Sequence, residues 1–303
     1  MPELPEVETV VRDLRPVLVD RQILAITVGP RPLRRPWQPE WESQLLGDRV
    51  TAIRRRAKWI IVDLGSDRRL LVHLGMTGQL TVAAAESPVL THTHVIFDLD
   101  GDGEQLRFRD VRRFGSVELI ADEANLQAFL AERVGPEPES LDPEGFAQAV
   151  CGSERPLKAI LLDQQVAAGV GNIYADEALH RAGLHPQRRG RTLMRSEADR
   201  LRNAIAEVIR HAIDNRGSTI RDYIGGSGLR GQFQHEFRVY GCTDQPCQHC
   251  GTPIAMVRVA GRASHFCPVC QPVQPRSRRK SRKSPSTTRS GSWSDTFPGD
   301  NGS

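Results

Sequence analysis

The sequence predicts an α+β protein of several domains: an N-terminal helix with an antiparallel β-structure, then a helical region and a small cysteine-rich module. Three observations support this prediction. Short runs of β-branched and apolar residues, separated by turn residues, fill positions 21–120. Apolar residues recur at helical spacing from about position 157. Two close pairs of cysteines stand within positions 247–270. The 303 residues suffice for two domains with substantial cores.

The first segment has the pattern of an amphipathic helix. Its apolar residues fall at i, i+3, i+4 and i+7, and they are Val7, Val10, Val11 and Leu14. Pro5 suits the first turn, where its missing N–H is not needed. Pro16 is expected to end the helix.

The residues before this helix carry reactive groups of their own. An initiator Met followed by the small residue Pro is readily removed, which would leave Pro2 with a free secondary amine. An α-amino group has a pKa of about 7.7–8.0, so near neutral pH part of it is a neutral nucleophile that can form a Schiff base. Glu3 could move protons at the same centre. The alternative is an ordinary N-terminal helix in a chain that begins Met-Pro.

Eight short strands are expected between residues 21 and 120. Their predicted ranges are 22–28, 49–55, 58–64, 69–74, 78–82, 93–99, 105–110 and 115–120. Turn residues lie at 65–67 and 100–103. Many short strands separated in this way indicate an antiparallel sandwich or barrel.

The second half of the chain is expected to be helical. Residues 134–150, rich in Pro and Gly at their start, are interpreted as a linker. Further on, one helix should end at 168–172 and another should run from Ile173 to Ala182. Residues 196–199 resemble a capping box that opens a third helix. The glycines at 169 and 171 would let the backbone approach a phosphate at a helix N-terminus.

The cysteine spacing predicts a metal site. Two C-x2-C pairs, separated by sixteen residues, are Cys247, Cys250, Cys267 and Cys270. This spacing is a strong signal for one tetrahedral structural zinc ion. A hairpin between the pairs would place Arg262 at its tip. Cys242 is interpreted as a free thiol, with an extra metal ligand as the alternative, and Cys151 as a buried or linker cysteine. His249 and His265 could compete as ligands, but four cysteines already complete the site.

The charge is unevenly distributed. The net charge is +4, but residues 271–303 contain seven Lys or Arg and only two Asp, so the rest of the chain is slightly negative. Overall basicity therefore does not by itself argue for nucleic acid. The Ser-, Pro- and Arg-rich tail cannot bury enough surface to order itself, and it either holds DNA weakly or is simply solvated. We expect no membrane span and no signal peptide.

The opening Met-Pro-Glu-Leu-Pro-Glu-Val-Glu-Thr resembles that of bacterial formamidopyrimidine-DNA glycosylases, which are 8-oxoguanine DNA glycosylase/AP lyases. Later motifs extend the resemblance over roughly residues 2–271. It implies a β-sandwich beside the N-terminal helix, a helix–two-turn–helix domain and a zinc-finger β-hairpin. The implied parts are a catalytic domain (1–133), a linker (134–150), the helix–two-turn–helix domain (151–241), the zinc finger (242–271) and a disordered basic tail (272–303).

The resemblance implies catalytic roles for four residues. Pro2 would be the Schiff-base nucleophile and Glu3 the proton donor. Lys58, in the segment Ala57-Lys58-Trp59, would contact phosphate and donate the proton for β-elimination. Arg262 would grip backbone phosphate and donate the proton for δ-elimination. Lys58 and Lys158 are the only lysines in residues 1–270 of this Arg-rich chain, which is a weak clue that points the same way.

The resemblance also implies residues that contact DNA. An enzyme that attacks C1′ must pull the nucleotide out of the stack, and apolar or planar side chains fill the void. Met76, Arg112 and Phe114 match the family's void-filling set, with Arg112 bonding the orphaned cytosine. The other expected contacts are His73, His94, Arg113, Lys158 and Asn172. The sequence departs from the family pattern at Thr93 and in the segment 219–234 of the lesion-capping loop.

The implied function is base-excision repair of damaged double-stranded DNA. The enzyme would remove oxidised purines, namely 8-oxoguanine and formamidopyrimidines, with β,δ-elimination and one structural Zn2+ per chain. It is expected to be a cytoplasmic, nucleoid-associated monomer with no membrane partner. One alternative is an endonuclease VIII-like glycosylase for oxidised pyrimidines, against which Leu4 and the void-filling set argue. Others are a catalytically silent damaged-DNA-binding protein and a zinc-ribbon RNA-binding module.

Overall fold

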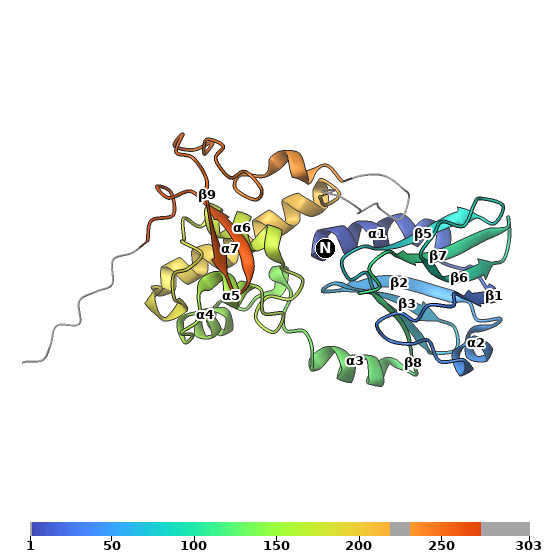
Figure 1. The fold of residues 1–303 in the computed structure, drawn as a ribbon. Coiled ribbons are helices and arrows are strands. Elements are labelled where there is room, and N and C mark those ends of the chain that lie inside the picture. Colours follow the sequence, from blue (N-terminus) through green and yellow to red (C-terminus); the bar gives the residue numbers. More distant parts are fainter. Residues whose placement is uncertain (1, 219–230, 274–303) are drawn as a thin grey trace, which may run out of the picture. The chain divides into compact units, whose positions relative to one another are not determined.

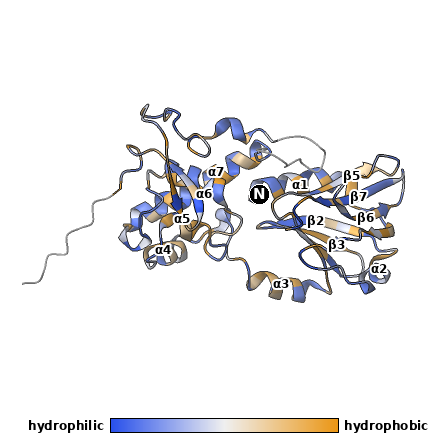
Figure 2. Ribbon diagram, viewed as in Figure 1, coloured by the Kyte–Doolittle hydropathy of each residue, from blue (hydrophilic) through white to orange (hydrophobic). Residues whose placement is uncertain are grey.

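A computed structural model describes residues 2–218 and 231–273 (Figure 1). Met1, most of the expected lesion-capping segment (219–230) and the tail from residue 274 lie outside the described residues. Hydrophobic and hydrophilic residues alternate along many helices and strands, as α1 (Leu4–Leu18) illustrates (Figure 2). Within the described ranges, no helix is long and apolar enough to cross a membrane.

The N-terminal part is an antiparallel β-sandwich with α1 packed on its core. One sheet has the order β1-β6-β7-β5 and the other β2-β3-β4-β8. The strands are β1 (Ile23–Val28), β2 (Val50–Arg56), β3 (Trp59–Leu64), β4 (Arg69–His73), β5 (Gly78–Ala84), β6 (Thr93–Leu99), β7 (Glu104–Asp110) and β8 (Ser116–Ile120). One apolar cluster joins the two sheets to α1, through side chains such as Phe97, Val62 and Val10. The eight strands are confirmed to within two residues at each end.

The helix α1 continues past the proline that was expected to end it. Pro16 lies inside the helix, which ends at Leu18. The ring of Pro16 is exposed, whereas Leu14 and Leu18 on either side are completely buried. Burial of these two leucines stabilises the last turn, since a proline near a helix end removes few hydrogen bonds.

Three helices were not predicted from the sequence: α2 (Glu40–Leu45), α3 (Glu123–Ala131) and α4 (Pro143–Cys151). The last of these occupies the second half of the stretch interpreted as a linker. Asp142 caps it by accepting the Gly145 N–H at 2.7 Å, and Pro143 stands in its first turn. An Asp-Pro helix start is a recognisable signal, so this helix could have been found.

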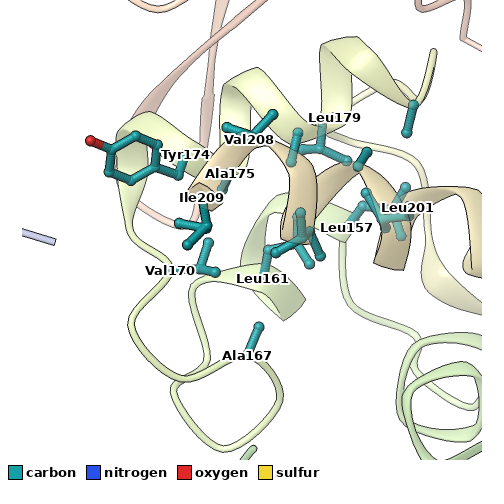
Figure 3. Close-up of a cluster of buried hydrophobic side chains, with 14 of the residues drawn as sticks. Leu157, Leu161, Ala167, Val170, Tyr174, Ala175, Leu179, Leu201, Val208 and Ile209 are labelled. Atoms are coloured by element: carbon teal, nitrogen blue, oxygen red, sulfur yellow. The ribbon is translucent and has the colours of Figure 1, made fainter. Parts of the chain in front are cut away.

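The helical region is built around α5 (Leu157–Leu161), α6 (Asn172–Arg181) and α7 (Arg195–Asp214). Side chains from all three meet in one cluster that includes Leu161, Leu179 and Leu201 (Figure 3). The start of α7 differs from the predicted capping box at 196–199. Its N-cap is Met194, whose N–H donates to the Glu197 carboxylate at 2.9 Å. Glu197 is held in this position by Arg188, at 2.6 Å.

The cysteine-rich module contains an antiparallel hairpin of β9 (Ala255–Val259) and β10 (Arg262–Phe266). The turn residues Ala260 and Gly261 both have positive φ angles, 49° and 74°. Short 3-10 helices connect other parts: η1 (Pro138–Ser140), η2 (Gly190–Thr192) and η3 (Phe233–Glu236). The predicted hairpin is therefore present, with Arg262 as the first residue after its turn.

Candidate active site and nucleic-acid interface

The start of the chain docks on the turn that precedes α6. The Leu4 N–H donates to the Gly169 carbonyl at 3.1 Å. The Glu3 carboxylate accepts the Ile173 N–H at 2.9 Å, in the first turn of α6. Residues 170 positions apart in the sequence thus form one site. The positive end of α6 favours the negative charge of Glu3.

Two glycines make this docking possible. A Cβ on Gly171 would lie 2.3 Å from Cδ of Glu3, and one on Gly169 would lie 2.6 Å from the Leu4 side chain. Gly169 also has a φ of +87°. The sequence suggested that these glycines admit a phosphate, but the protein's own N-terminus takes the space that they leave.

Glu3 and Pro2 are both buried at this junction. The Glu3 N–H donates to Oε2 of Glu6 at 2.7 Å, which closes the capping box of α1. Oε1 of Glu6 accepts the Ser218 N–H at 2.8 Å and the Tyr174 hydroxyl. Burial, together with the charge of Glu3, raises the pKa of Glu6 to about 6. The residues next to Pro2 are therefore held rigidly by hydrogen bonds.

Lys58 approaches the same turn from the β-sandwich. Its Nζ donates to the Val170 carbonyl at 3.0 Å, between the two glycines. Burial lowers the pKa of Lys58, while the charges of Glu3 and Glu6 oppose that change. A buried lysine whose pKa is lowered gives up its proton more readily than an exposed one, which suits a proton-transfer role.

The turn that carries Lys58 is held by a residue that the sequence did not single out. Glu137, in the stretch interpreted as a linker, accepts the Ala57 N–H at 2.6 Å and binds the Arg55 guanidinium at 2.7 Å. Ala57 has a φ of +52°, an unfavourable conformation for alanine. Glu137 thereby stabilises the strained residue next to Lys58. Nothing in the local sequence around Pro136-Glu137-Pro138 indicates a partner eighty positions away.

Four predicted residues line one cleft of about 580 Å³: Lys58, His73, Asn172 and Arg262. Arg262 is exposed, and its positive charge contributes to lowering the pKa of Lys58. Oδ1 of Asn172 is buried and has no hydrogen-bond partner among the described residues. A larger hollow of about 970 Å³, between α6, α7 and the cysteine-rich module, contains none of the predicted catalytic residues.

His73 is neutral in this cleft. Its ring packs on Trp59, with the centroids 4.6 Å apart, and its Nδ1 accepts the Gly75 N–H at 3.0 Å. Burial and the charges of Lys58 and Arg34 lower its pKa to about 4. The Nε2–H is then the hydrogen-bond donor left for a ligand.

Three predicted DNA contacts lie together on an exposed loop after β7: Arg112, Arg113 and Phe114. The Arg112 guanidinium stands over the Phe114 ring, 4.8 Å from its centroid. The completely buried Asp110 shapes the loop, since its carboxylate accepts the Gly115 N–H at 2.7 Å. Asp110 has no role in the sequence-based hypothesis, although its place before Val-Arg-Arg-Phe-Gly fits a turn-forming carboxylate.

The turn containing Met76 packs against this loop. Gly75 has a φ of +60°, and a Cβ there would lie 2.5 Å from the backbone nitrogen of Gly115. The two backbones are therefore in direct contact, and the structure brings Met76, Arg112 and Phe114 together on adjacent loops.

Two predicted DNA contacts are buried instead. His94 is only 4% exposed, and its Nε2 lies 2.9 Å from the Asp110 carbonyl. Lys158 is completely buried and is bound to Asp176 at 2.6 Å and to the Asn172 carbonyl at 2.6 Å. Neither side chain reaches the surface in this structure, and direct contact of His94 and Lys158 with DNA stays a prediction. Both support residues that reach the surface: His94 lies under the Asp110 loop and Lys158 under the start of α6.

The four cysteines form a closed metal site. Sγ atoms of Cys247, Cys250, Cys267 and Cys270 all lie within 4.8 Å of one another. Four thiolates at this spacing suit a tetrahedral structural zinc ion with no open position for substrate. Cys242, His249 and His265 are outside this cluster, as predicted. The ion would hold the hairpin that presents Arg262.

Three family models match the chain. They are the formamidopyrimidine-DNA glycosylase N-terminal domain at residues 1–117, the formamidopyrimidine-DNA glycosylase H2TH domain at 134–223, and a zinc finger found in FPG and IleRS at 244–273. Among curated relatives, the formamidopyrimidine-DNA glycosylase of Herpetosiphon aurantiacus is 43% identical over 275 residues, covering 89% of this chain and 100% of the relative. That of Geobacillus kaustophilus is 44% identical over 276 residues, with the same coverage.

Solved structures give the same result. A complex between Lactococcus lactis Fpg and DNA containing an abasic site is 39% identical, with a TM-score of 0.84, and the match covers 89% of this chain and 100% of that one. A structure of MutM with DNA containing carbocyclic 8-oxo-G is 38% identical, with a TM-score of 0.83, 90% coverage of this chain and 100% of that one.

Proposed function

The chain belongs to the formamidopyrimidine-DNA glycosylase family, and on this premise we propose how its residues carry out the repair of oxidised purines. The enzyme is a DNA glycosylase/AP lyase that binds damaged double-stranded DNA, removes 8-oxoguanine and formamidopyrimidines, and contains a structural zinc ion. The single observation that carries the residue assignments is the docking of the Pro2-Glu3 end at the start of α6, where Lys58 reaches the same turn.

The proposed reaction starts at Pro2. Its secondary amine, freed by removal of Met1, attacks C1′ of the everted nucleotide, and the bond from C1′ to the damaged base breaks. Glu3 protonates the sugar ring oxygen, so the ring opens and the C1′–N bond becomes a Schiff base. Glu3 is placed for this step because it is buried and directly follows Pro2, and the Ile173 N–H fixes the position of its carboxylate.

Two eliminations follow from the Schiff base. Loss of a C2′ proton breaks the bond from C3′ to its phosphate oxygen, and Lys58 supplies a proton in this β-elimination. Breakage of the bond from C5′ to its phosphate oxygen then completes the δ-elimination, for which Arg262 is the proton donor. Both side chains line the cleft, where their positive charges would stabilise the departing phosphates. Zinc takes no part in these steps and holds the hairpin.

The loops at the edge of the sandwich hold the duplex open. Phe114 is 44% exposed, unusual for an aromatic side chain, and stands beside Arg112 and the Met76 turn. We assign Phe114 to wedging the base step and Arg112 to the orphaned cytosine. His73, Arg113 and Asn172 are assigned to phosphates. The Nε2–H of His73 is left for a ligand, the Arg113 side chain is exposed, and Asn172 lines the same cleft as His73. We further propose that the enzyme acts at the nucleoid in the cytoplasm, where its DNA substrate lies.

Borohydride trapping on a duplex with 8-oxoguanine opposite cytosine tests the proposal. Reduction of the Schiff base should give a covalent adduct at residue 2, lacking Met1 and identifiable by mass spectrometry. Pro2→Gly should suppress both excision and trapping. Bound DNA without any adduct from the Met1-free protein would instead favour a silent damaged-DNA-binding protein. Preferred incision of thymine glycol would favour an endonuclease VIII-like specificity.

A further inference from the structure

A buried carboxylate on α6 joins three elements that the proposed reaction leaves unconnected. Asp176 is completely buried. Its Oδ1 lies 2.6 Å from Nζ of Lys158 on α5. Its Oδ2 accepts the backbone N–H of His265 on β10 at 3.0 Å and lies 3.0 Å from Nδ1 of the same residue. One side chain therefore binds both the helical domain and the zinc hairpin.

Burial of the charged Asp176 and Lys158 side chains costs free energy, so a contribution to stability does not explain why they are buried. Removing charges from water is unfavourable, and a buried ion pair is often no more stabilising than apolar residues of the same size. The best-attested use of a buried ion pair is to specify one register between packed elements. The side chains of Lys158 and His265 are 0% and 11% exposed, so solvent offers little alternative to Asp176.

The first link from Asp176 leads to the Glu3 site. Nζ of Lys158 also donates to the Asn172 carbonyl at 2.6 Å. Asn172 is the first residue of α6, and the N–H of the next residue, Ile173, binds Glu3. Lys158 and Asp176 thus hold the first turn of α6 at the position that Glu3 requires.

The second link leads to Arg262. His265 stands on β10 three residues after Arg262, in a strand paired with β9 along its whole length. Holding His265 against α6 therefore sets where the start of β10 reaches into the cleft. The zinc module has another attachment, since the Glu177 carboxylate accepts the N–H groups of Val239 and Tyr240 at 3.0 and 2.8 Å. That attachment lies before the first cysteine pair. A further one is on β10 itself, where the Phe266 ring packs against His185 with the centroids 4.4 Å apart, at the end of the strand away from Arg262.

We propose that Asp176 is a positioning residue that sets Arg262, through His265, relative to Glu3 and Lys58, and so couples δ-elimination to the earlier steps. The inference rests on the proposed function of Arg262. When the contact between Asp176 and the His265 ring is removed, the backbone N–H bond remains, so the hairpin keeps its metal but holds Arg262 less firmly at the departing 5′ phosphate. Base removal and β-elimination, which use residues on the other side of the cleft, continue.

The test compares the products of single-turnover incision on 8-oxoguanine duplex. In His265→Ala, excision should stay within about twofold of wild type, while the δ- to β-product ratio should fall roughly 10- to 100-fold, as for a slightly displaced catalytic group. His265→Asn, whose amide nitrogen can occupy the Nδ1 position, should restore the ratio. Met256→Ala is the matched control, since Met256 pairs with His265 on the hairpin and is 48% exposed.

A double variant separates positioning from general damage. If His265 acts through Arg262, His265→Ala should add no further loss of δ-product to Arg262→Ala, and zinc content should equal that of wild type. An unchanged product ratio in His265→Ala, or losses that add in the double variant, would overturn the positioning of Arg262 through the contact between Asp176 and the His265 ring. Absence of any incision by the wild-type enzyme would instead refute the proposed function. If His265→Ala loses zinc, the δ- to β-product ratio of His265→Asn is compared with that of wild type instead. A lowered ratio in His265→Asn would then contradict the proposal.

Discussion

One wall of the cleft carries Lys58 and the other carries Arg262, and the two walls are held in different ways. Lys58 follows Ala57, which is 1% exposed and belongs to an apolar cluster with Ile61, Leu71 and Ala168. That cluster adjoins the large core of the sandwich. Arg262 stands on a hairpin whose own buried apolar cluster comprises only Val239, Cys247, Ile254 and Cys267.

This difference predicts which kinds of substitution disrupt each wall. Apolar burial is distributed over many side chains, so a single polar change leaves the Lys58 wall in place. The Arg262 wall depends on a metal ion and on a few polar links to α6, each of which can be removed by one substitution. The turn that precedes and starts α6 connects the two walls, since Lys58, Glu3 and Lys158 all form hydrogen bonds with its backbone.

Glu3→Gln should have the largest effect, because it removes the chemistry without disturbing either wall. Loss of a general acid typically costs about 10²- to 10⁴-fold in rate. We expect a loss of this size in ring opening, measured as single-turnover strand incision, with wild-type zinc content and DNA affinity. An incision rate equal to that of wild type would contradict the assignment of Glu3 as proton donor.

Cys250→Ser should disrupt only the wall of the cleft that carries Arg262. Because a structural zinc site contributes folding free energy to its module, loss of one ligand should release the ion and weaken DNA binding by roughly 10- to 100-fold. Metal analysis and DNA titration measure both changes. Cys151→Ser is the control, since Cys151 is a free thiol outside the metal cluster. Full zinc occupancy in Cys250→Ser would refute this ligand set.

Gly171→Ala should disturb the turn that the two walls share. The added Cβ would lie 2.3 Å from Cδ of Glu3, so the N-terminus must shift. Overpacking of this kind costs about 1–3 kcal/mol in the free energy of unfolding, and displacement of Glu3 should lower excision by up to about 100-fold. At Gly65 the nearest heavy atom would be 3.5 Å away, so Gly65→Ala is the matched control. Equal stability and activity in both variants would mean that Glu3 does not occupy this place.

The smallest expected effect is a pH dependence of the free energy of unfolding, which arises from Glu6. Its pKa rises from 4.5 to about 6 on folding, so the folded state binds the proton more tightly than the unfolded state. The resulting stabilisation is present below pH 4.5 and is lost as the pH rises through about 6, which amounts to about 2 kcal/mol. Glu6→Gln should lack this loss. Denaturant unfolding of both proteins between pH 4 and 7.5 measures the difference, and parallel curves would rule out the raised pKa.

The sequence alone was sufficient for the elements whose signals are local. Alternating apolar residues and turn residues located all eight strands of the sandwich to within two positions. Cysteine spacing located the four members of the metal cluster, and the resemblance of the opening residues indicated the family. Helices α2, α3 and α4 were not predicted because they have only 6, 9 and 9 residues, too few for a clear apolar repeat.

Only the tertiary structure decided which side chains are exposed and which support others. His94 and Lys158 are side chains of a type that often contacts DNA, and the structure shows that both are buried beneath the residues that they support. Asp110, Glu137 and Asp176 act through partners on other elements, and the spacing of residues along the chain does not report such partners. Burial and long-range hydrogen bonds depend on which surfaces meet when distant segments pack, and that information is distributed over the whole sequence rather than held in any one motif.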